Sequence, residues 1–156
     1  MNTVAIVSEK GNNPSSLKLP LDDVLAYRHE GVVERISKKE GLSAEESLAL
    51  FYDLLRFLYM CGITSKAERG GTYAPPERID GAWHHFILFT RDYRVFCNRY
   101  FGRLLHHHPT TTEQKVMQDK EGVRKTLADA KMLFGDLSAN WATKHADCAD
   151  CCNCYS

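Results

Sequence analysis

The chain has 156 residues, of which 44% are apolar and 26% are charged, the composition of one ordinary globular domain rather than of a fibrous or disordered chain. Twenty basic and twenty acidic side chains give a formal net charge of zero, so we expect no nucleic-acid partner, because nucleic-acid binders usually carry a basic excess. The sequence has no apolar run near the ~18–20 residues that cross a bilayer and no basic start of a signal peptide, so we expect a cytoplasmic protein with no membrane partner.

The first half of the chain predicts two helices behind a loose start. Residues 1–20 are polar and broken by glycine and proline, which predicts a flexible N-terminal arm. Apolar residues then recur at helical spacing over residues 21–39. A capping-box pattern that begins at Ser43 opens a second helix, over residues 44–61, with apolar residues on nearly every face. A helix of this kind belongs at the centre of a bundle, and Gly62 is its expected end.

The second half predicts further helices separated by glycines and prolines. A loop over residues 64–76 precedes a helix that begins near Glu77, and its core stripe continues as far as Tyr100. Another helix is predicted over residues 112–134, and a short amphipathic turn over residues 137–141. Neither strand alternation nor an internal repeat is evident. The sequence therefore predicts an all-α fold, a compact bundle of about five to six helices.

Cysteines gather in a tail beyond the single helical domain, which we place at residues 21–141. Four of the six cysteines fall within the last nine residues, and residues 142–156 form this cysteine-rich tail. Thiolates at such spacing can close on Zn²⁺ or Cu(I), so the tail is a second candidate metal site. The alternatives are a disordered end with oxidisable thiols and a short peptide that is itself modified or cleaved. The donors of this second site would be His145, Cys148, Cys151, Cys152 and Cys154.

Two other parts of the sequence carry the residue types of a metal site. Asp80 and His84 are four residues apart in one predicted helix, so both side chains leave the same face. The second part is the run of three histidines from His106 to His108. Two imidazoles and one carboxylate form the ligand set of catalytic zinc sites and of mononuclear iron(II) sites. The pattern predicts one Zn or Fe ion held by Asp80, His84 and either His106 or His107.

These two parts can meet only if the predicted helix breaks. One straight helix over residues 77–101 would carry Tyr100 ~24 Å beyond His84, at ~1.5 Å per residue. The six or seven residues that follow reach at most ~20–25 Å. A break near Thr90, which is an acceptable N-cap, lets the second piece fold back toward the first. The metal-site hypothesis therefore depends on a change of chain direction at Thr90.

Each candidate ligand also has an ordinary structural explanation. Asp80 suits the first turn of a helix as an acidic residue, and His84 suits a helix interface as a hydrogen-bonded imidazole. His106 and His107 also fit a polar loop. Cys97 lies on the core stripe, where a buried thiol packs as a small hydrophobe; in a folded-back chain it becomes a candidate fourth ligand.

A longer motif surrounds these residues. It reads Asp80-Gly-Ala-Trp83-His84-His-Phe-Ile-Leu88-Phe-Thr90-Arg-Asp-Tyr93, followed by Phe96-Cys97, Gly102 and His106-His107. This order of residues resembles the core signature of the glycine-rich domain-containing protein-like family, over about residues 63–109. The resemblance implies an all-helical domain, and family members with a Ser-Pro pair near positions 89 and 90 imply a helix boundary there. The activity of that family is largely undefined, so the resemblance implies no particular activity. The chain departs from the plant members because it lacks their glycine-rich extension and adds a cysteine-rich tail.

The sequence thus favours a small helical metal-binding protein, with a metalloenzyme as one version, in which an open position on the ion holds a polarised water. The alternative is a non-catalytic interaction or carrier domain whose cysteine-rich tail binds metal or is a modified peptide substrate. The expected partners are a small-molecule or peptide ligand at the ion, or a protein that binds the tail.

Overall fold

The computed structural model describes residues 21–64, 73–107 and 112–143, with the backbone alone over residues 112–120. Within these ranges it consists of helices and contains no strand, so the predicted all-α fold is confirmed. None of the described helices is both long and apolar enough to span a bilayer. The elements are α1 (Leu21–Leu25), α2 (Glu30–Glu40), α3 (Ala44–Ile63), α4 (Glu77–Ile87), α5 (Thr90–Phe101), α6 (Thr112–Phe134) and the short 3₁₀ helix η2 (Ala139–Trp141).

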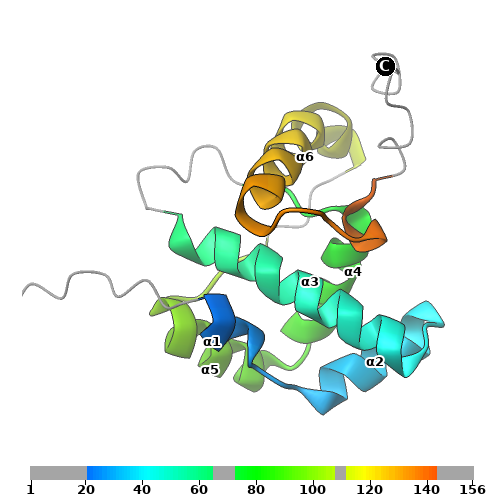
Figure 1. Cartoon of the computed structure of the whole chain (residues 1–156), viewed down its shortest axis with the longest axis vertical. Helices are drawn as coiled ribbons and strands as arrows, with labels where there is room; N and C mark the ends of the chain where they lie inside the picture. Colours follow the sequence, from blue (N-terminus) through cyan, green and yellow to red (C-terminus); the bar gives the residue numbers. More distant parts are fainter. Residues whose placement is uncertain (1–20, 65–72, 108–111, 144–156) are drawn as a thin grey trace, which may run out of the picture.

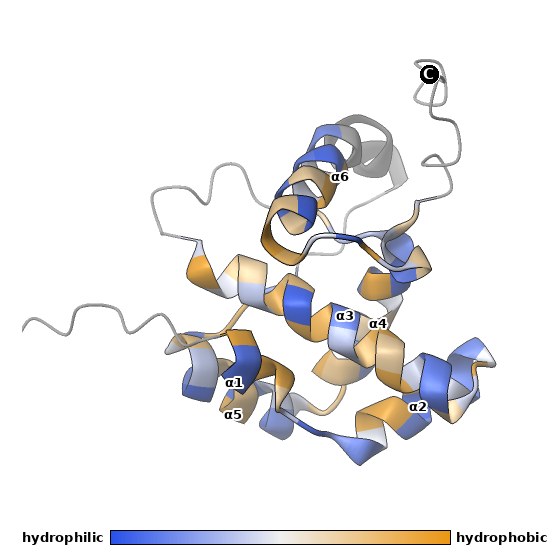
Figure 2. Ribbon diagram, in the orientation of Figure 1, coloured by the Kyte–Doolittle hydropathy of each residue, from blue (hydrophilic) through white to orange (hydrophobic). Residues whose placement is uncertain are grey.

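Helix α3 is the central element of the bundle. Figure 1 shows it crossing the middle of the molecule, with α1, α2 and α5 on one side and α6 on the other. The predicted capping box is present: the Glu46 N–H donates to Ser43 Oγ, and the Ser43 N–H donates to the Glu46 carboxylate. Hydrophobic residues recur along α3 (Figure 2) and many of them are buried, as expected for a helix with little polar surface.

The first predicted helix is in fact two helices, α1 and α2. The guanidinium of Arg28 donates to the carbonyl oxygens of Leu25 and Tyr27, at 2.8 and 2.9 Å, and so satisfies the end of α1. His29 is the N-cap of α2, and its Nδ1 accepts the Val32 N–H at 3.1 Å. Because these side chains bond the backbone groups at the helix ends, the chain can leave the helix between α1 and α2. The spacing of apolar residues does not reveal this break.

Gly62 does not end α3, contrary to expectation, but gives α5 room to approach it. A Cβ atom at Gly62 would lie 2.2 Å from Cδ1 of Phe101, so only glycine permits this contact. The end of α3 is satisfied instead by Arg103, which donates to the carbonyl oxygens of Cys61 and Thr64 at 2.9 and 3.3 Å. The segment after α5 is thereby anchored to α3.

The chain changes direction between α4 and α5, as the broken-helix hypothesis requires. Helix α4 ends at Ile87 and α5 begins at Thr90. The Phe89 N–H donates to the carbonyl oxygen of Phe86 at 3.0 Å, a tight turn between the two helices. Helix α5 ends at Phe101 and is capped by Gly102, which has a left-handed φ of 65°. This turn and this ending return the residues after α5 to the side of α4.

A buried carboxylate joins α3 to the C-terminal segment. Asp53 is only 2% exposed. It accepts hydrogen bonds from Arg56 at 3.0 Å, from Ser138 Oγ at 2.7 Å and from Asn140 Nδ2 at 2.9 Å. The indole of Trp141, 2% exposed, is buried in the same segment. Asp53 therefore fixes η2 against the core.

Candidate metal centre

Three of the predicted ligands converge on one point. Asp80 and His84 project from α4, and His107 lies in the segment that follows α5. The Nε2 atoms of His84 and His107 are 2.6 Å apart. His107 Nε2 lies 3.3 Å from Oδ1 of Asp80, and His84 Nε2 lies 3.8 Å from its Oδ2. One ligand atom from each residue lies within 4.8 Å of the others, and no second group of this kind occurs in the described part of the chain.

These separations suit a small divalent ion. Zinc binds nitrogen and oxygen ligands at ~2.0–2.2 Å, so tetrahedral ligand atoms lie about 3.4 Å from each other. One Asp80 oxygen lies 3.3 Å from His107 Nε2 and the other lies 3.8 Å from His84 Nε2, so each distance is close to that value. The two imidazole nitrogens are closer, at 2.6 Å, and would have to separate by less than about 1 Å to bind one ion.

One side of the cluster is sheltered and the other is open. The His107 side chain is 12% exposed, that of Asp80 is 29% exposed and that of His84 is 50% exposed. The indole of Trp83 covers the His107 ring, with centroids 4.4 Å apart. An ion at this point would therefore be reached from the side of His84.

The segment that carries His107 is positioned by a buried tyrosine. The Tyr93 hydroxyl donates to the carbonyl oxygen of Leu105 at 2.6 Å and accepts the Trp83 Nε1–H at 3.0 Å. Burial raises the pKa of Tyr93 far above its ordinary value, so the hydroxyl stays protonated and remains a donor. Together with Arg103, this bond holds the segment before His107 at two points.

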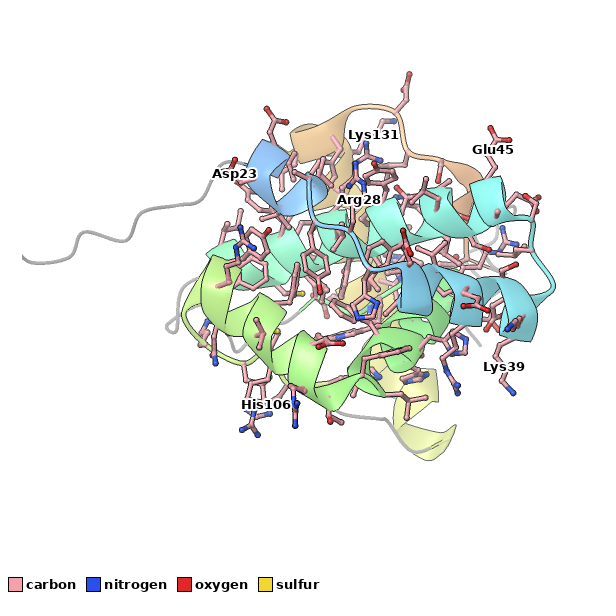
Figure 3. The ribbon with its side chains drawn as sticks, turned by 90° about the horizontal axis from the view of Figure 1, so that it is seen from below. Asp23, Arg28, Lys39, Glu45, His106 and Lys131 are labelled. Carbon is pink, nitrogen blue, oxygen red and sulfur yellow. The ribbon has the colours of Figure 1, made fainter. Side chains whose placement is uncertain are left out.

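Other predicted ligands lie elsewhere. His106 is exposed and is not a member of the cluster, and Figure 3 shows its side chain at the edge of the molecule, directed away from the ribbon. Cys97 is fully buried in the core and is not a member either. Burial raises the pKa of its thiol, and its Sγ lies beside Tyr93 and Leu105. Its surroundings are those of a packed small hydrophobe.

The tail candidates lie outside the described residues, as does His108. These tail candidates are His145, Cys148, Cys151, Cys152 and Cys154.

Sequence reasoning missed the hydrogen bonds that Trp83 and Tyr93 make. Their hydrogen bond spans ten residues across the break between α4 and α5, so the spacing of apolar residues gives no sign of it. His85, the neighbour of His84, shows the opposite case: its Nε2 lies 2.8 Å from a carboxylate oxygen of Glu40 and takes no part in the cluster. Sequence proximity alone does not distinguish the two histidines.

Comparison with known proteins identifies a family for this chain. No curated protein and no solved structure matches this chain. A family model described as UCP032817-like matches residues 24–131, which include all three clustered residues. This longer match corrects the resemblance to the glycine-rich domain-containing protein-like family, which rested on a short motif within residues 63–109. The chain belongs to the uncharacterised UCP032817-like family.

Proposed function

We propose that this chain is a small helical metal-binding protein in which one divalent ion, zinc or iron(II), is held by Asp80, His84 and His107. The observation that supports it is the convergence of three ligand atoms to within 4.8 Å, although the two histidines are 23 residues apart in sequence. The adjacent histidines, His85 and His106, lie outside the cluster, so a local abundance of histidine does not explain it.

The charges of the cluster also favour a cation. An ionised carboxylate only accepts hydrogen bonds, and each neutral imidazole has one nitrogen with a free lone pair. One carboxylate with two neutral imidazoles carries a charge of −1, and a divalent ion supplies a partner for the lone pairs of all three residues. The Nε2 atoms of His84 and His107 lie 2.6 Å apart, where one can donate a hydrogen bond to the other. A bound cation would replace that hydrogen bond with one metal–nitrogen bond to each ring.

Three protein ligands leave at least one coordination position open. This is the arrangement of catalytic zinc, whereas structural zinc is closed by four protein ligands. Because the His84 side chain is half exposed, we expect the open position on the solvent side. A water held there by zinc would be polarised for hydrolysis of a small-molecule or peptide ligand, and iron(II) would bind a co-substrate at the same position. A metalloenzyme is therefore the version of this proposal that we favour.

The test is the metal content of the full-length, tag-free chain. Its four tail cysteines (Cys148, Cys151, Cys152 and Cys154) are replaced by serine, so that tail thiols do not contribute. Elemental analysis should find about one zinc or iron per chain, and below ~0.2 per chain in the same protein with His84→Ala. Content below ~0.2 before that change, or content unaffected by it, contradicts the proposal.

The same measurement tests the carrier alternative. If the tail is the metal site, the serine replacements remove the metal, and Asp80→Asn in the chain with an intact tail leaves it bound. If both sites bind metal, the chain with the intact tail should contain more than the one ion expected of the cluster.

A further inference from the structure

The hydroxyl group of Tyr93 lies between the two sides of the proposed metal centre. It accepts a hydrogen bond from the indole of Trp83, the residue that precedes His84 on α4. It donates to the carbonyl oxygen of Leu105, two residues before His107. One side chain thus joins the helix that carries two of the ligands to the segment that carries the third.

We propose that Tyr93 is a positioning residue of the metal centre, whose hydroxyl sets the distance between His107 and the Asp80–His84 pair. This inference rests on the proposed function. The hydroxyl is not one of the three proposed ligands and acts on them through Trp83 and Leu105.

Burial makes these two hydrogen bonds effective. Tyr93 and Trp83 are each 5% exposed and Leu105 is 4% exposed, so water does not readily replace a lost partner. Without the hydroxyl, both the indole N–H and the Leu105 carbonyl group would be buried without their present partner, which is unfavourable. The segment before His107 would then shift to find a new one.

The indole of Trp83 also restricts the position of the His107 ring. Its ring lies against the His107 ring, with centroids 4.4 Å apart and an angle of 37° between the planes. The hydrogen bond to Tyr93 fixes the orientation of this indole. His107 is therefore constrained through its backbone and through its ring by the same hydroxyl.

A substitution can remove the hydroxyl and keep the ring. The Tyr93 ring packs edge-on against Phe86, with centroids 5.1 Å apart and an interplanar angle of 81°. Tyr93→Phe retains this packing. Residues that orient metal ligands change metal affinity by ~10–100-fold when they are replaced, so we expect Tyr93→Phe to weaken metal binding by about 10-fold.

The experiment is a double-mutant cycle of Ni²⁺ affinity, measured by calorimetry on the full-length chain with serines in the tail. Ni²⁺ binds nitrogen and oxygen sites more tightly than iron(II) or cobalt(II) does, so variants that lack one ligand remain measurable. The cycle comprises the parent, Tyr93→Phe, His107→Ala and the double variant. Because the hydroxyl acts through His107, Tyr93→Phe should change the affinity by less than about two-fold once His107 is absent.

Tyr100→Phe is the matched control. Tyr100 lies on the same helix, is also buried and packs its ring against Phe96, with centroids 5.0 Å apart. Removing the Tyr100 hydroxyl should leave the Ni²⁺ affinity within about two-fold of the parent. Unfolding by urea reports any loss of stability in each variant separately.

The outcomes separate the two proposals. A parent chain that binds no Ni²⁺ overturns the metal centre and the role of Tyr93 together. A parent that binds, with Tyr93→Phe binding equally well, overturns the positioning role and leaves the metal centre standing. An equal loss with and without His107 also overturns it, because the hydroxyl would then act on the fold in general.

Discussion

Asp53 and Asp80 are both carboxylates that the fold holds against side chains from distant parts of the chain, but their neighbours differ. Asp53 is 2% exposed and accepts hydrogen bonds from a guanidinium, a hydroxyl and an amide group. Asp80 is 29% exposed on its side chain and lies beside the imidazoles of His84 and His107, whose nitrogens are themselves 2.6 Å apart.

This difference separates a structural carboxylate from a candidate ligand. Two of the three donors around Asp53 cannot act as metal ligands, because guanidinium and amide nitrogens have no available lone pair. The third, the Ser138 hydroxyl, donates its proton to Asp53 and accepts the Asn140 N–H, so its hydrogen bonds are made within the protein. Imidazole nitrogens have an available lone pair, and the carboxylate beside them stays accessible from solvent. A buried carboxylate is thus expected to contribute stability where its neighbours are donors, and metal affinity where its neighbours are ligands.

The strongest way to break this comparison is to remove a ligand from the Asp80 cluster. His84→Ala should weaken Zn²⁺ binding by at least ~100-fold, because an ion held by three protein ligands loses one of them. The free energy of unfolding without metal should change by less than ~0.5 kcal/mol, since the side chain is half exposed. Competition with a chromophoric chelator measures the affinity.

His106→Ala is the control for this experiment. It removes an exposed histidine of the same run that lies outside the cluster, and zinc affinity should stay within about two-fold of the parent. Equal losses in the two variants would mean that zinc binds the histidine run nonspecifically.

The complementary prediction concerns the structural carboxylate. Asp53→Ala should lower the free energy of unfolding by ~2–3 kcal/mol, because it leaves Ser138 and Asn140 without their buried acceptor. Zinc affinity should not change. Urea unfolding with and without saturating zinc checks both statements, because the stability added by zinc at 100 times its Kd, ~2.7 kcal/mol, should be the same in parent and variant. A smaller zinc increment in Asp53→Ala would show that the two carboxylates are coupled.

A smaller change sharpens the description of the Asp53 site. Ser138→Ala removes one donor to Asp53 and also the side chain that accepts the Asn140 N–H as the N-cap of η2. We expect a loss of about 1 kcal/mol, measured by urea unfolding, because the carboxylate keeps its bonds to Arg56 and Asn140. A loss of stability as large as that of Asp53→Ala would show that the Ser138 hydroxyl accounts for the whole stabilising effect of Asp53.

The two sites were not equally predictable from sequence. Asp80 and His84 share one helical face by spacing alone, and that half of the cluster follows from local geometry. The choice between His106 and His107 does not, because the direction of each side chain depends on how Arg103 and Tyr93 hold the segment. The Asp53 site was even harder to predict, because its donors Ser138 and Asn140 are 85 and 87 residues away in sequence.

The fold shows the same division between local and distant causes. The capping box at Ser43 could be predicted from neighbouring residues. The boundary near Thr90 was also expected, but Thr90 is the first residue of α5 and not its N-cap, which is Phe89 with no capping side-chain bond. The break between α1 and α2 could not be predicted, because it depends on Arg28 and His29 acting as caps in a stretch whose apolar spacing suits one helix. Gly62 was misread as a helix end, because its role is to admit the ring of Phe101 from another helix.

The smallest predicted effect comes from a change that should alter the stability of α4 without altering the metal affinity of the ligands on it. Gly81 lies next to Asp80 inside this helix, where a glycine costs ~0.5–1 kcal/mol relative to alanine. A Cβ atom there would meet only Glu40 Oε1, at an ordinary contact distance of 3.7 Å. Gly81→Ala should therefore raise the free energy of unfolding by about 0.5–1 kcal/mol, measured by urea denaturation without metal.

Zinc affinity should stay within about two-fold in this variant, because a stiffer helix backbone leaves the three ligand atoms where they are. Gly62→Ala provides the contrast, since its new Cβ atom would collide with Phe101 and should destabilise the chain by ~1–3 kcal/mol. If Gly81→Ala instead weakened zinc binding as strongly as a lost ligand, α4 would have to distort when the ion binds. The cluster would then not be preformed, and Asp80 would differ from Asp53 less than their neighbours indicate.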